Sequence, residues 1–362
     1  MSTADMAGKS LFRAHPIKFI LSFGLSAFLV WFVFKDLDID GFWEALEGVS
    51  ISYILFGAVL LIYSVWVRAQ RWRILISPQG ESRTKDLFDS LLIGYLGNDV
   101  LPFRLGEVLR AALAARKTKL RISGIGASIL VDRLLDMLSF LIIAVCLFML
   151  YPLADWAQTV AVLGFVALVV FFFGAFLLRG KRERLFQWIQ KWALKKEAAG
   201  KAKLAGHIMS LFKGVETIWQ MPQPLKVTLL TIYLWVLYII VTALGLAAFH
   251  FDFTPVEFFV AAMILLTFTT LSLSIPSAPG FVGTYHGAVV AALALVDIPS
   301  TPAKAFAIVF HLLNYLAMAL PGAIIFFKTG LKFQFAADAS EVTGSTVEQE
   351  SASSKNSLQP PD

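Results

Sequence analysis

Long apolar stretches alternate with short polar segments along this chain of 362 residues. A helix needs about 20 apolar residues to cross the hydrocarbon core of a bilayer. Two segments, 87–115 and 256–296, each hold an apolar run, a break and a short helix. The first is too short and too charged for two spans and is interpreted as a re-entrant hairpin, whereas the second is either a hairpin or a pair of spans. Clear spans are predicted at about residues 17–34, 51–67, 125–151, 157–178, 225–249 and 302–328.

The predicted fold class is an all-α polytopic membrane protein with about six to eight transmembrane helices, including two re-entrant or broken ones. The composition agrees, with 58% hydrophobic residues, 15% charged residues and a mean hydropathy of +0.73. The single cysteine, Cys146, excludes a disulfide framework and a cysteine-based metal site. The sequence lacks a Walker A motif, an HExxH motif and a GxSxG motif with plausible triad partners. We therefore expect no ATP hydrolysis, no cofactor and no enzymatic activity.

The charged residues predict the orientation of the chain. The loops between the basic segments are acidic or neutral, with Lys35 as their only basic residue and Lys304 just beyond the last of them. Basic segments and acidic or neutral loops alternate along the chain if the segments 87–115 and 256–296 each return to the side of the membrane from which they entered. The positive-inside rule then places both termini in the cytoplasm, and this topological pattern argues against a nucleic-acid partner. Arg and Lys concentrate at 9–18, 68–85, 104–121, 179–226 and 328–332.

Two polar breaks in the apolar pattern resemble each other. In the first, Asn98–Arg110, Pro102 precedes Gly106 by four residues, and in the second, Pro276–His286, Pro279 precedes Gly283 by four. Proline removes a backbone donor and glycine loosens a helix, so such breaks survive in lipid only inside protein or beside a wet cavity. Matched breaks in two halves of a membrane protein indicate the binding site of a transporter. The alternative is a coincidence between two loops that contain proline and glycine.

The topology predicts two inverted repeats, because the first hairpin would enter from the cytoplasm and the second from the opposite side. The linker between the repeats is basic and aromatic, and it is either an amphipathic segment on anionic headgroups or a solvated connection. The tail is rich in Ser, Ala, Glu and Gln and is expected to be disordered. The expected parts are a cytoplasmic N-terminus (1–16), a transmembrane domain (17–330) with repeat A at 51–178, linker 179–224 and repeat B at 225–328, and a tail (335–362), with the helix 17–34 peripheral.

The first break carries the candidate residues Asn98, Asp99, Arg104, Glu107 and Arg110. Glu107 and Arg110 are three positions apart and share a helix face. The helix N-terminus at Gly106 would direct free N–H groups into the break, where they attract anions. The two arginines would complete a site for a phosphate or a carboxylate, since a guanidinium can bind two oxygens at once. The alternative is that the arginines are anchors at the cytoplasmic edge of the membrane.

A second cluster lies in the predicted span 125–151. Asp132 and Asp136 are one turn apart on one face, and Arg133 is turned about 100° away. The two carboxylates could pair with Arg104 or Arg110 and close a network around the first break. The alternative is a structural ion pair that fixes helix packing.

The second break offers hydrogen-bonding groups without permanent charge around Pro279, Gly280 and Gly283. His286 could titrate or bind a phosphate, although a single histidine in an apolar setting is more often structural. His311 and Asn314 on the last span share a face and either line the same cavity or bond helix to helix. The remaining polar groups are Ser272, Ser274, Ser277, Thr284 and Tyr285.

Three motifs carry a family resemblance. They are the Leu-Pro-x-Arg-x-Gly-Glu-x-x-Arg core of Asn98–Arg110, the segment Val131–Asp136, and the segment Pro276–Gly283. In this order, between these spans, they resemble the lysylphosphatidylglycerol synthase transmembrane region, over roughly residues 17–330. The resemblance implies a polytopic protein of the bacterial inner membrane that moves an amphiphilic lipid between leaflets. It would place lipid handling on Arg104, Glu107, Arg110, Arg133 and Asp136.

The chain departs from that family in two places. Its C-terminal region is a polar tail where larger members carry a soluble aminoacyl-transferase domain, so we expect it not to make lysyl-lipid. The family's second motif usually has Glu near the position of His286, which puts a cationic headgroup specificity of that half in doubt.

The functional hypothesis is a lipid flippase or a transporter of a lipid-linked intermediate, without its own ATPase. Arg104, Arg110 and Arg133 would hold the phosphate of an anionic or aminoacylated phospholipid or glycolipid, and Glu107, Asp132 and Asp136 would orient them. One alternative is a secondary transporter of a small anion. Another is a membrane-embedded enzyme or accessory subunit for lipid-linked glycans, in which the three carboxylates could bind a divalent metal. A homo-oligomer is left open.

Overall fold

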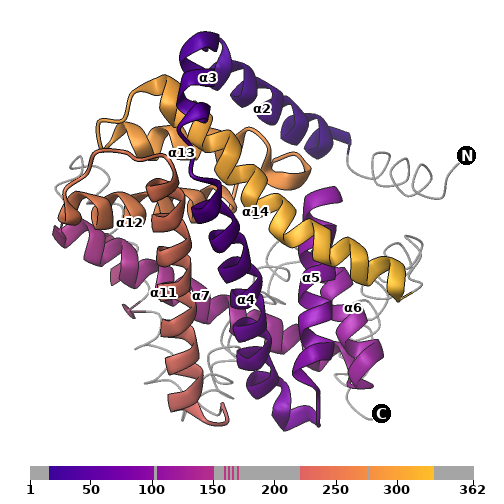
Figure 1. The fold of residues 1–362 in the computed structure, drawn as a ribbon. Coiled ribbons are helices and arrows are strands. Elements are labelled where there is room, and N and C mark those ends of the chain that lie inside the picture. The colour runs from indigo at the N-terminus through magenta and orange to yellow at the C-terminus, as the bar shows by residue number, and fades with distance from the viewer. Residues whose placement is uncertain are drawn as a thin grey trace, which may run out of the picture. The chain divides into compact units, whose positions relative to one another are not determined.

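The computed structural model describes residues 16–101, 104–150, 221–275 and 277–329, with a few helical residues between 159 and 170 (Figure 1). Every regular element in these ranges is helical, so the predicted all-α class is confirmed. The α-helices are α2 (Pro16–Phe34), α3 (Ile39–Glu47), α4 (Ile51–Ile76), α5 (Thr84–Val100), α6 (Gly106–Thr118), α7 (Ile122–Leu150), α11 (Pro224–Ala248), α12 (Pro255–Ser272), α13 (Thr284–Ala294) and α14 (Ser300–Lys328), and the 3-10 turns are η1 (Ser77–Gln79) and η4 (Pro279–Phe281).

Four helices in the described ranges are long and apolar enough to cross a membrane: α4 with its following turn, α11, α12 and α14. Helix α2 contributes a shorter apolar stretch, Leu21–Phe34. The protein is therefore a multi-pass membrane protein. Most of the predicted span 157–178 and nearly all of the predicted linker 179–224 lie outside the described residues, as do residues 1–15 and the predicted tail.

The chain forms two compact units. Unit 1 comprises Met1–Val49, Lys85–Lys119 and Leu271–Asp362, and unit 2 comprises Ser50–Thr84 and Leu120–Thr270. Each unit takes segments from both predicted repeats, so a unit is not a repeat. The inverted-repeat arrangement itself stays a prediction, and each unit is described by itself below.

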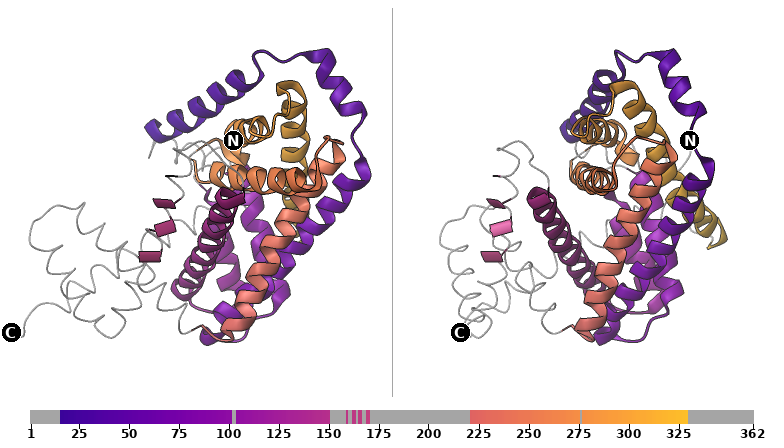
Figure 2. Two further views of the ribbon diagram at one scale, coloured as in Figure 1. Left: turned by 90° about the vertical axis from the view of Figure 1, so that its left-hand side faces the viewer. Right: turned by 60° about the vertical axis from the view of Figure 1, so that its left-hand side comes forward.

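Unit 2 is built on the antiparallel pair α4 and α11, which run side by side in both views of Figure 2. The backbone N–H of Ser50, at the start of α4, donates to the carbonyl of Ala248, at the end of α11, over 2.8 Å. Midway along the pair, Val67 packs on Leu234 and Leu237. Helix α7 packs against both helices, and large apolar side chains cover the outer surface of the pair, as contact with lipid tails requires.

Unit 1 contains the hairpin of α5 and α6. The two helices are in close contact, because a Cβ added to Gly97 would lie 2.7 Å from the Cα of Gly106. At the open end of the hairpin, Lys117 of α6 pairs with Asp89 of α5. Helix α5 has 17 residues and α6 has 13, so each is shorter than a membrane span. This agrees with the predicted hairpin.

Helices α13 and α14 pack together in unit 1, and the C-terminal part of α14 packs on the hairpin. At Gly322 of α14 an added Cβ would lie 2.6 Å from the carbonyl oxygen of Leu92, so only glycine permits this approach. Phe326, one turn further, joins a core with Ile93 and Leu109. Helix α13 has only 11 residues and follows the break at η4, so the segment 256–296 is not a pair of full spans.

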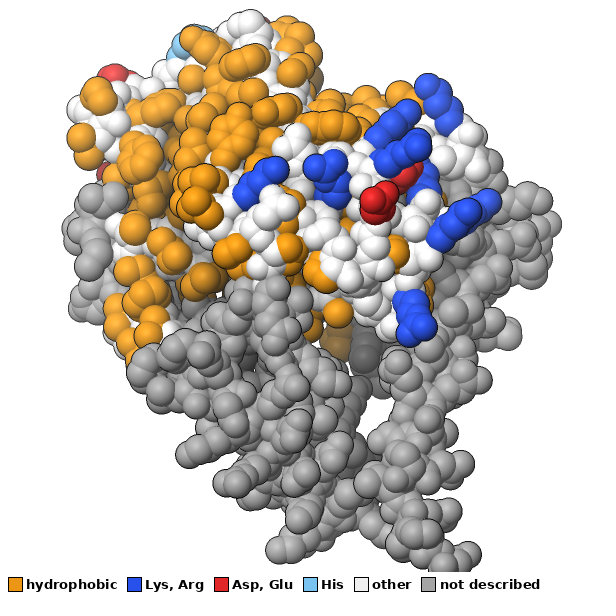
Figure 3. All heavy atoms as spheres, turned by 90° about the horizontal axis from the view of Figure 1, so that it is seen from below, with side chains coloured by type: hydrophobic (Ala, Val, Ile, Leu, Met, Phe, Trp, Pro, Cys, Tyr) orange, Lys and Arg blue, Asp and Glu red, His pale blue; other side chains and the backbone are white. Residues whose placement is uncertain are grey.

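Lys and Arg side chains gather on one face of the protein, beside hydrophobic side chains (Figure 3). In unit 1, exposed basic residues occur near the open end of the hairpin, at Lys85, Arg116 and Lys119. This gathering fits the charge pattern of the sequence. The cytoplasmic orientation of that face stays a prediction.

Candidate functional site

The two breaks lie against each other in unit 1. Helix α5 ends at Val100, and the guanidinium carbon of Arg104 lies 5.5 Å from the centroid of the Phe281 ring, a cation–π contact. A Cβ added to Gly280 would lie 3.5 Å from the carbonyl oxygen of Asp99 and 3.2 Å from the ring of Tyr315. We name this region, comprising residues 98–101, 104–106 and 277–283, the break junction. It joins one predicted motif to the other.

Positive backbone φ angles mark both sides of the junction. Gly280 has φ +70°, and two residues with side chains, Arg104 at +55° and Phe281 at +59°, also adopt the left-handed region. Such angles are uncommon outside glycine and occur often at functional sites. The cation–π pair at the centre of the junction is therefore formed by two residues in unusual backbone conformations.

Helix α6 begins at Gly106, as predicted, and Leu105 before it provides no side-chain cap. A Cβ on Gly106 would collide with the backbone of Gly94 and with Asn98, so glycine is required there. Arg110 is almost fully buried, and its guanidinium lies 3.6 Å from the carboxylate of Glu107. The predicted shared face of Glu107 and Arg110 is thus confirmed. Arg104, in contrast, is exposed at the junction.

Three polar side-chain atoms at the junction are buried without a hydrogen-bond partner among the described residues. They are Asn98 Oδ1, Asp99 Oδ2 and Ser277 Oγ. Nearly all buried polar groups in proteins have a partner, which can be protein, water or ligand. These atoms can accept hydrogen bonds from a bound polar molecule.

A chain of hydrogen bonds crosses the second break. The N–H of Gly283 donates to His286 Nδ1 over 3.3 Å, His286 Nε2 lies 3.2 Å from His311 Nδ1, and His311 Nε2 lies 2.8 Å from the carbonyl oxygen of Gly280. The ring of Tyr285 stacks on His311 with 4.7 Å between centroids. The predicted site residues Gly283 and His286 are therefore bonded directly, and His311 of α14 joins His286 to Gly280. Pro279 is the first residue of the η4 turn.

Helix α2 supports the second break from another side. Ser26 Oγ accepts a hydrogen bond of 2.8 Å from the N–H of Ala278. A Cβ on Gly283, whose φ is +90°, would lie 2.6 Å from the carbonyl oxygen of Ser26. From the sequence, this helix is placed outside both repeats, which stays a prediction, and the structure adds that its backbone and one serine contact the second break.

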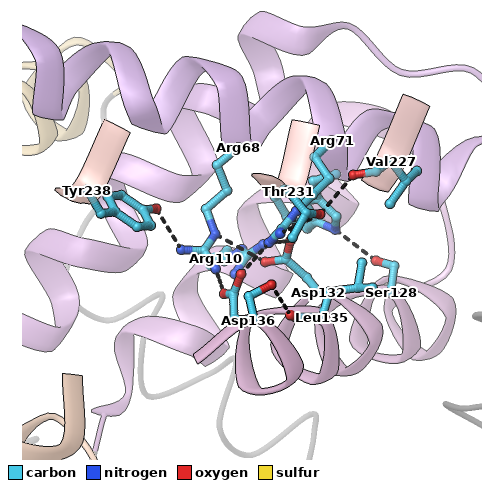
Figure 4. A network of polar contacts seen from close by, with 12 residues as sticks. Arg68, Arg71, Arg110, Ser128, Asp132, Leu135, Asp136, Val227, Thr231 and Tyr238 are labelled. Carbon is cyan, nitrogen blue, oxygen red and sulfur yellow. Dashed lines mark hydrogen bonds and ion pairs between the residues drawn. The ribbon is translucent and has the colours of Figure 1, made fainter. Parts of the chain in front are cut away.

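Unit 2 contains a second polar cluster, formed by Arg68 and Arg71 of α4 with Asp132 and Asp136 of α7 (Figure 4). Arg71 Nη2 lies 2.6 Å from Asp132 Oδ1 and 2.7 Å from Asp136 Oδ1. Arg68 Nε lies 3.2 Å from Asp132 Oδ2, and Arg68 also pairs with Asp136. Arg71 and Asp132 are both completely buried. We call these four residues the charge cluster.

Helix α11 adds hydroxyl groups to the charge cluster. Arg71 Nη1 donates to Thr231 Oγ1 over 3.1 Å, and Arg68 Nη1 lies 3.5 Å from the hydroxyl of Tyr238. Two positive and two negative groups thus meet inside three packed helices, with several hydrogen bonds between them. Buried charges are tolerated when they are paired in this way.

The charge cluster revises one part of the sequence interpretation. Asp132 and Asp136 share a face as predicted, since both contact Arg71, and Arg133 is exposed. Their partners within unit 2, Arg68 and Arg71, were not among the predicted site residues. The predicted pairing with Arg104 or Arg110 of unit 1 stays a prediction.

The charge cluster had a signal in the sequence. The predicted span ended at residue 67, but α4 continues to Ile76 and carries Arg68 and Arg71 one turn apart on its inner face. Two arginines three positions apart at the end of a long apolar run could have identified them as partners for an Asp pair. In the part of the chain that the structure describes, no three His, Cys, Asp or Glu residues gather as metal ligands.

Comparison with known proteins agrees with the motifs. The profile of the family described as "Lysylphosphatidylglycerol synthase TM region" matches residues 19–322. A "UPF0104 membrane protein" of Methanothermobacter thermautotrophicus is 23% identical over 294 residues, covering 77% of this chain and 86% of that protein. No solved structure matches. Because the family profile covers most of the chain, from α2 through both breaks to α14, this protein belongs to the lysylphosphatidylglycerol synthase transmembrane region family.

Proposed function

We propose that this protein moves an anionic or aminoacylated lipid between the leaflets of the bacterial inner membrane. The observation that supports the proposal most directly is the contact between the two breaks in unit 1, at Arg104 with Phe281 and at Asp99 with Gly280. Broken helices that meet are the usual substrate sites of membrane transporters. The family description names a lipid, which supports a lipid rather than a soluble anion as the substrate.

The chemistry of the break junction suits a phospholipid headgroup. Arg104 is exposed at the junction and offers a planar group that can bind two phosphate oxygens. Asn98 Oδ1, Asp99 Oδ2 and Ser277 Oγ could accept hydrogen bonds from hydroxyl or amine groups of the same headgroup. Arg104 would therefore be the principal phosphate ligand.

The charge cluster would have a supporting role in this proposal. Its carboxylates and guanidiniums neutralise one another within α4 and α7, and Arg71 and Asp132 are completely buried. A phosphate would have to displace a carboxylate to bind there. Asp132 and Asp136 would then fix helix packing rather than contact the lipid, which favours the structural alternative for these two residues.

Lipid translocation in proteoliposomes tests the proposal. The purified protein is reconstituted with fluorescent anionic, aminoacylated or zwitterionic phospholipids, and the fraction accessible to a membrane-impermeant quencher is followed over time. Arg104→Gln should slow movement of the anionic lipid at least about tenfold, because a charged hydrogen bond contributes roughly 1.5–3 kcal/mol. The matched control is Arg83→Gln, which changes an exposed arginine in the segment before α5.

The outcomes separate clearly. Movement by wild type and Arg83→Gln but not by Arg104→Gln supports a flippase with its phosphate site at the junction. Equal movement by all three proteins would refute the role of Arg104. No movement of any of these lipids by the wild type would contradict the proposed activity.

A further inference from the structure

The hydrogen bonds of the second break determine where the protons of His286 and His311 lie. Because the N–H of Gly283 donates to His286 Nδ1, that nitrogen carries no proton. A neutral His286 then has its proton on Nε2 and donates it to His311 Nδ1. His311 Nδ1 is consequently an acceptor, so His311 carries its proton on Nε2 and donates to the carbonyl oxygen of Gly280. All four ring nitrogens are satisfied only when both rings are neutral.

One additional proton cannot enter this arrangement without breaking it. If His286 takes the proton, its Nδ1 becomes a donor and faces the N–H of Gly283. If His311 takes the proton on Nδ1, that nitrogen becomes a donor and His286 Nε2 must accept from it. The proton of His286 then lies on Nδ1, where it again faces the N–H of Gly283. On either ring, therefore, the bond between Gly283 and His286 is lost while the other two bonds are kept.

We propose that the pair of His286 and His311 is a proton-binding site that controls the conformation of the second break. The ligand is a proton, and the group released by its binding is the N–H of Gly283, at the start of α13. Gly283 is also held against Ser26 at φ +90°, a conformation that depends on its surroundings. Loss of its hydrogen bond would thus loosen the turn that faces the first break.

The surroundings of the pair contain few charged groups. The ring of Phe34, at the end of α2, lies nearly perpendicular to His286, and the ammonium of the next residue, Lys35, lies over the rings of Trp31 and Phe32 instead. From its own helix the pair meets Tyr285, and from α14 it meets Tyr315. From the first break, Asp99 and Arg104 contact the η4 turn to which His311 is bonded. Asp99 is the acid in this set and could balance a proton on the pair.

Hydrogen–deuterium exchange of the full chain in lipid nanodiscs tests the proposal. Exchange of the peptide containing Gly283 is measured at pH 7.5 and pH 3.5, because a buried pair that loses a hydrogen bond on protonation takes up its proton only below the range of an ordinary histidine, and times are scaled to intrinsic amide exchange. We expect protection of this peptide to fall about fivefold to tenfold at the lower pH, as the loss of one hydrogen bond predicts.

A variant and a matched control identify the cause. His286→Asn can still accept from the N–H of Gly283 but cannot take up a proton, so its protection should not change between the two pH values. His250→Asn changes an exposed histidine at φ +52°, a conformation that asparagine tolerates, and should behave as the wild type. Constant protection in the wild type, or the same fall in His286→Asn, would overturn the proposal.

A second measurement does not depend on the folding of a variant. Solid-state NMR of the wild type with 15N-labelled histidine should show, at pH 7.5, two hydrogen-bonded rings that each carry a proton on Nε2 only. At pH 3.5 one ring of this pair should be protonated on both nitrogens. Two neutral rings at both pH values would contradict the proposal, and the result is independent of whether any lipid is transported.

Discussion

The charge cluster of unit 2 and the break junction of unit 1 differ in how completely their polar groups satisfy one another. In the charge cluster, Arg71 contacts both Asp132 and Asp136 within 2.7 Å. In the break junction, among the described residues, Asp99 Oδ2 and Ser277 Oγ have no hydrogen-bond partner. Buried charges that are fully paired hold helices together, whereas unsatisfied polar atoms beside a break are available to a ligand. We therefore expect the charge cluster to hold helices together, and the break junction is the region that we propose for binding.

The largest effect is expected from Asp132→Asn. The substitution keeps the shape of the side chain but leaves Arg68 and Arg71 with one carboxylate for two buried guanidiniums. Breaking a buried ion pair in this way costs about 3–5 kcal/mol. The free energy of unfolding of the purified protein, measured by denaturant titration in detergent, should fall by this amount. Glu44→Gln, at an exposed carboxylate of α3, is the control and should change it by less than about 0.5 kcal/mol.

Gly283→Ala should have the next largest effect on stability. The new Cβ would meet the carbonyl oxygen of Ser26 at 2.6 Å, in a backbone conformation of φ +90°. We expect a loss of about 2–3 kcal/mol in the same titration. Gly24→Ala in helix α2 is the control, because its Cβ would meet nothing within 4 Å, and it should stabilise the helix by up to about 1 kcal/mol. Equal stability of the two variants would show that the junction is not held as described.

Ser26→Ala should cost less. It removes the acceptor for the N–H of Ala278, a bond of 2.8 Å, and one hydrogen bond contributes about 1 kcal/mol. Thermal unfolding monitored by tryptophan fluorescence would detect the shift. Ser300→Ala, at an exposed serine, should leave the midpoint unchanged. A silent Ser26→Ala would mean that α2 does not support the second break.

Asp99→Asn should cost no stability and gives the sharpest contrast. The same change of residue type that disrupts the charge cluster removes, at the junction, a charge that has no hydrogen-bonded partner among the described residues. The free energy of unfolding should not fall and should rise by up to about 1 kcal/mol, because a partly buried charge without a hydrogen-bonded partner is removed. Lipid translocation in proteoliposomes should nevertheless slow about tenfold, because a headgroup contact is lost. A large loss of stability with unchanged transport would reverse the roles of the two regions.

The fold could be predicted from the sequence to the extent that its signals are local. Spans follow from stretches of apolar residues, so α4, α11 and α14 begin within a few residues of their predicted positions. The break of the first hairpin was predicted from Pro102 and Gly106, because residues that interrupt a helix are tolerated in a membrane only where protein or water satisfies the freed backbone groups. The class of the protein and the two breaks were thus accessible without a structure.

The partners of the site residues could not be predicted in the same way. Arg71 and Asp132 are 61 positions apart, and no local pattern states that they will meet. The arginines of α4 lie in a basic segment at the end of a predicted span, where the positive-inside rule already accounts for them. That rule gives no reason to look for carboxylate partners. Ser26 gives no signal, because a small polar residue in an apolar helix is common. His286 and His311 were both identified, but their mutual hydrogen bond depends on how α13 packs on α14.

The hydrogen bond between Ser26 and Ala278 spans 252 positions and therefore has a consequence for biosynthesis. Ribosomes add about 5–20 residues per second, so the acceptor on α2 would wait roughly 10–50 seconds before its donor is made. Helix α2 must remain in the bilayer through that interval on the strength of its own apolar side chains. The arrival of residues 278–283 at a helix made 252 positions earlier would thus precede the packing of α14 on the same break.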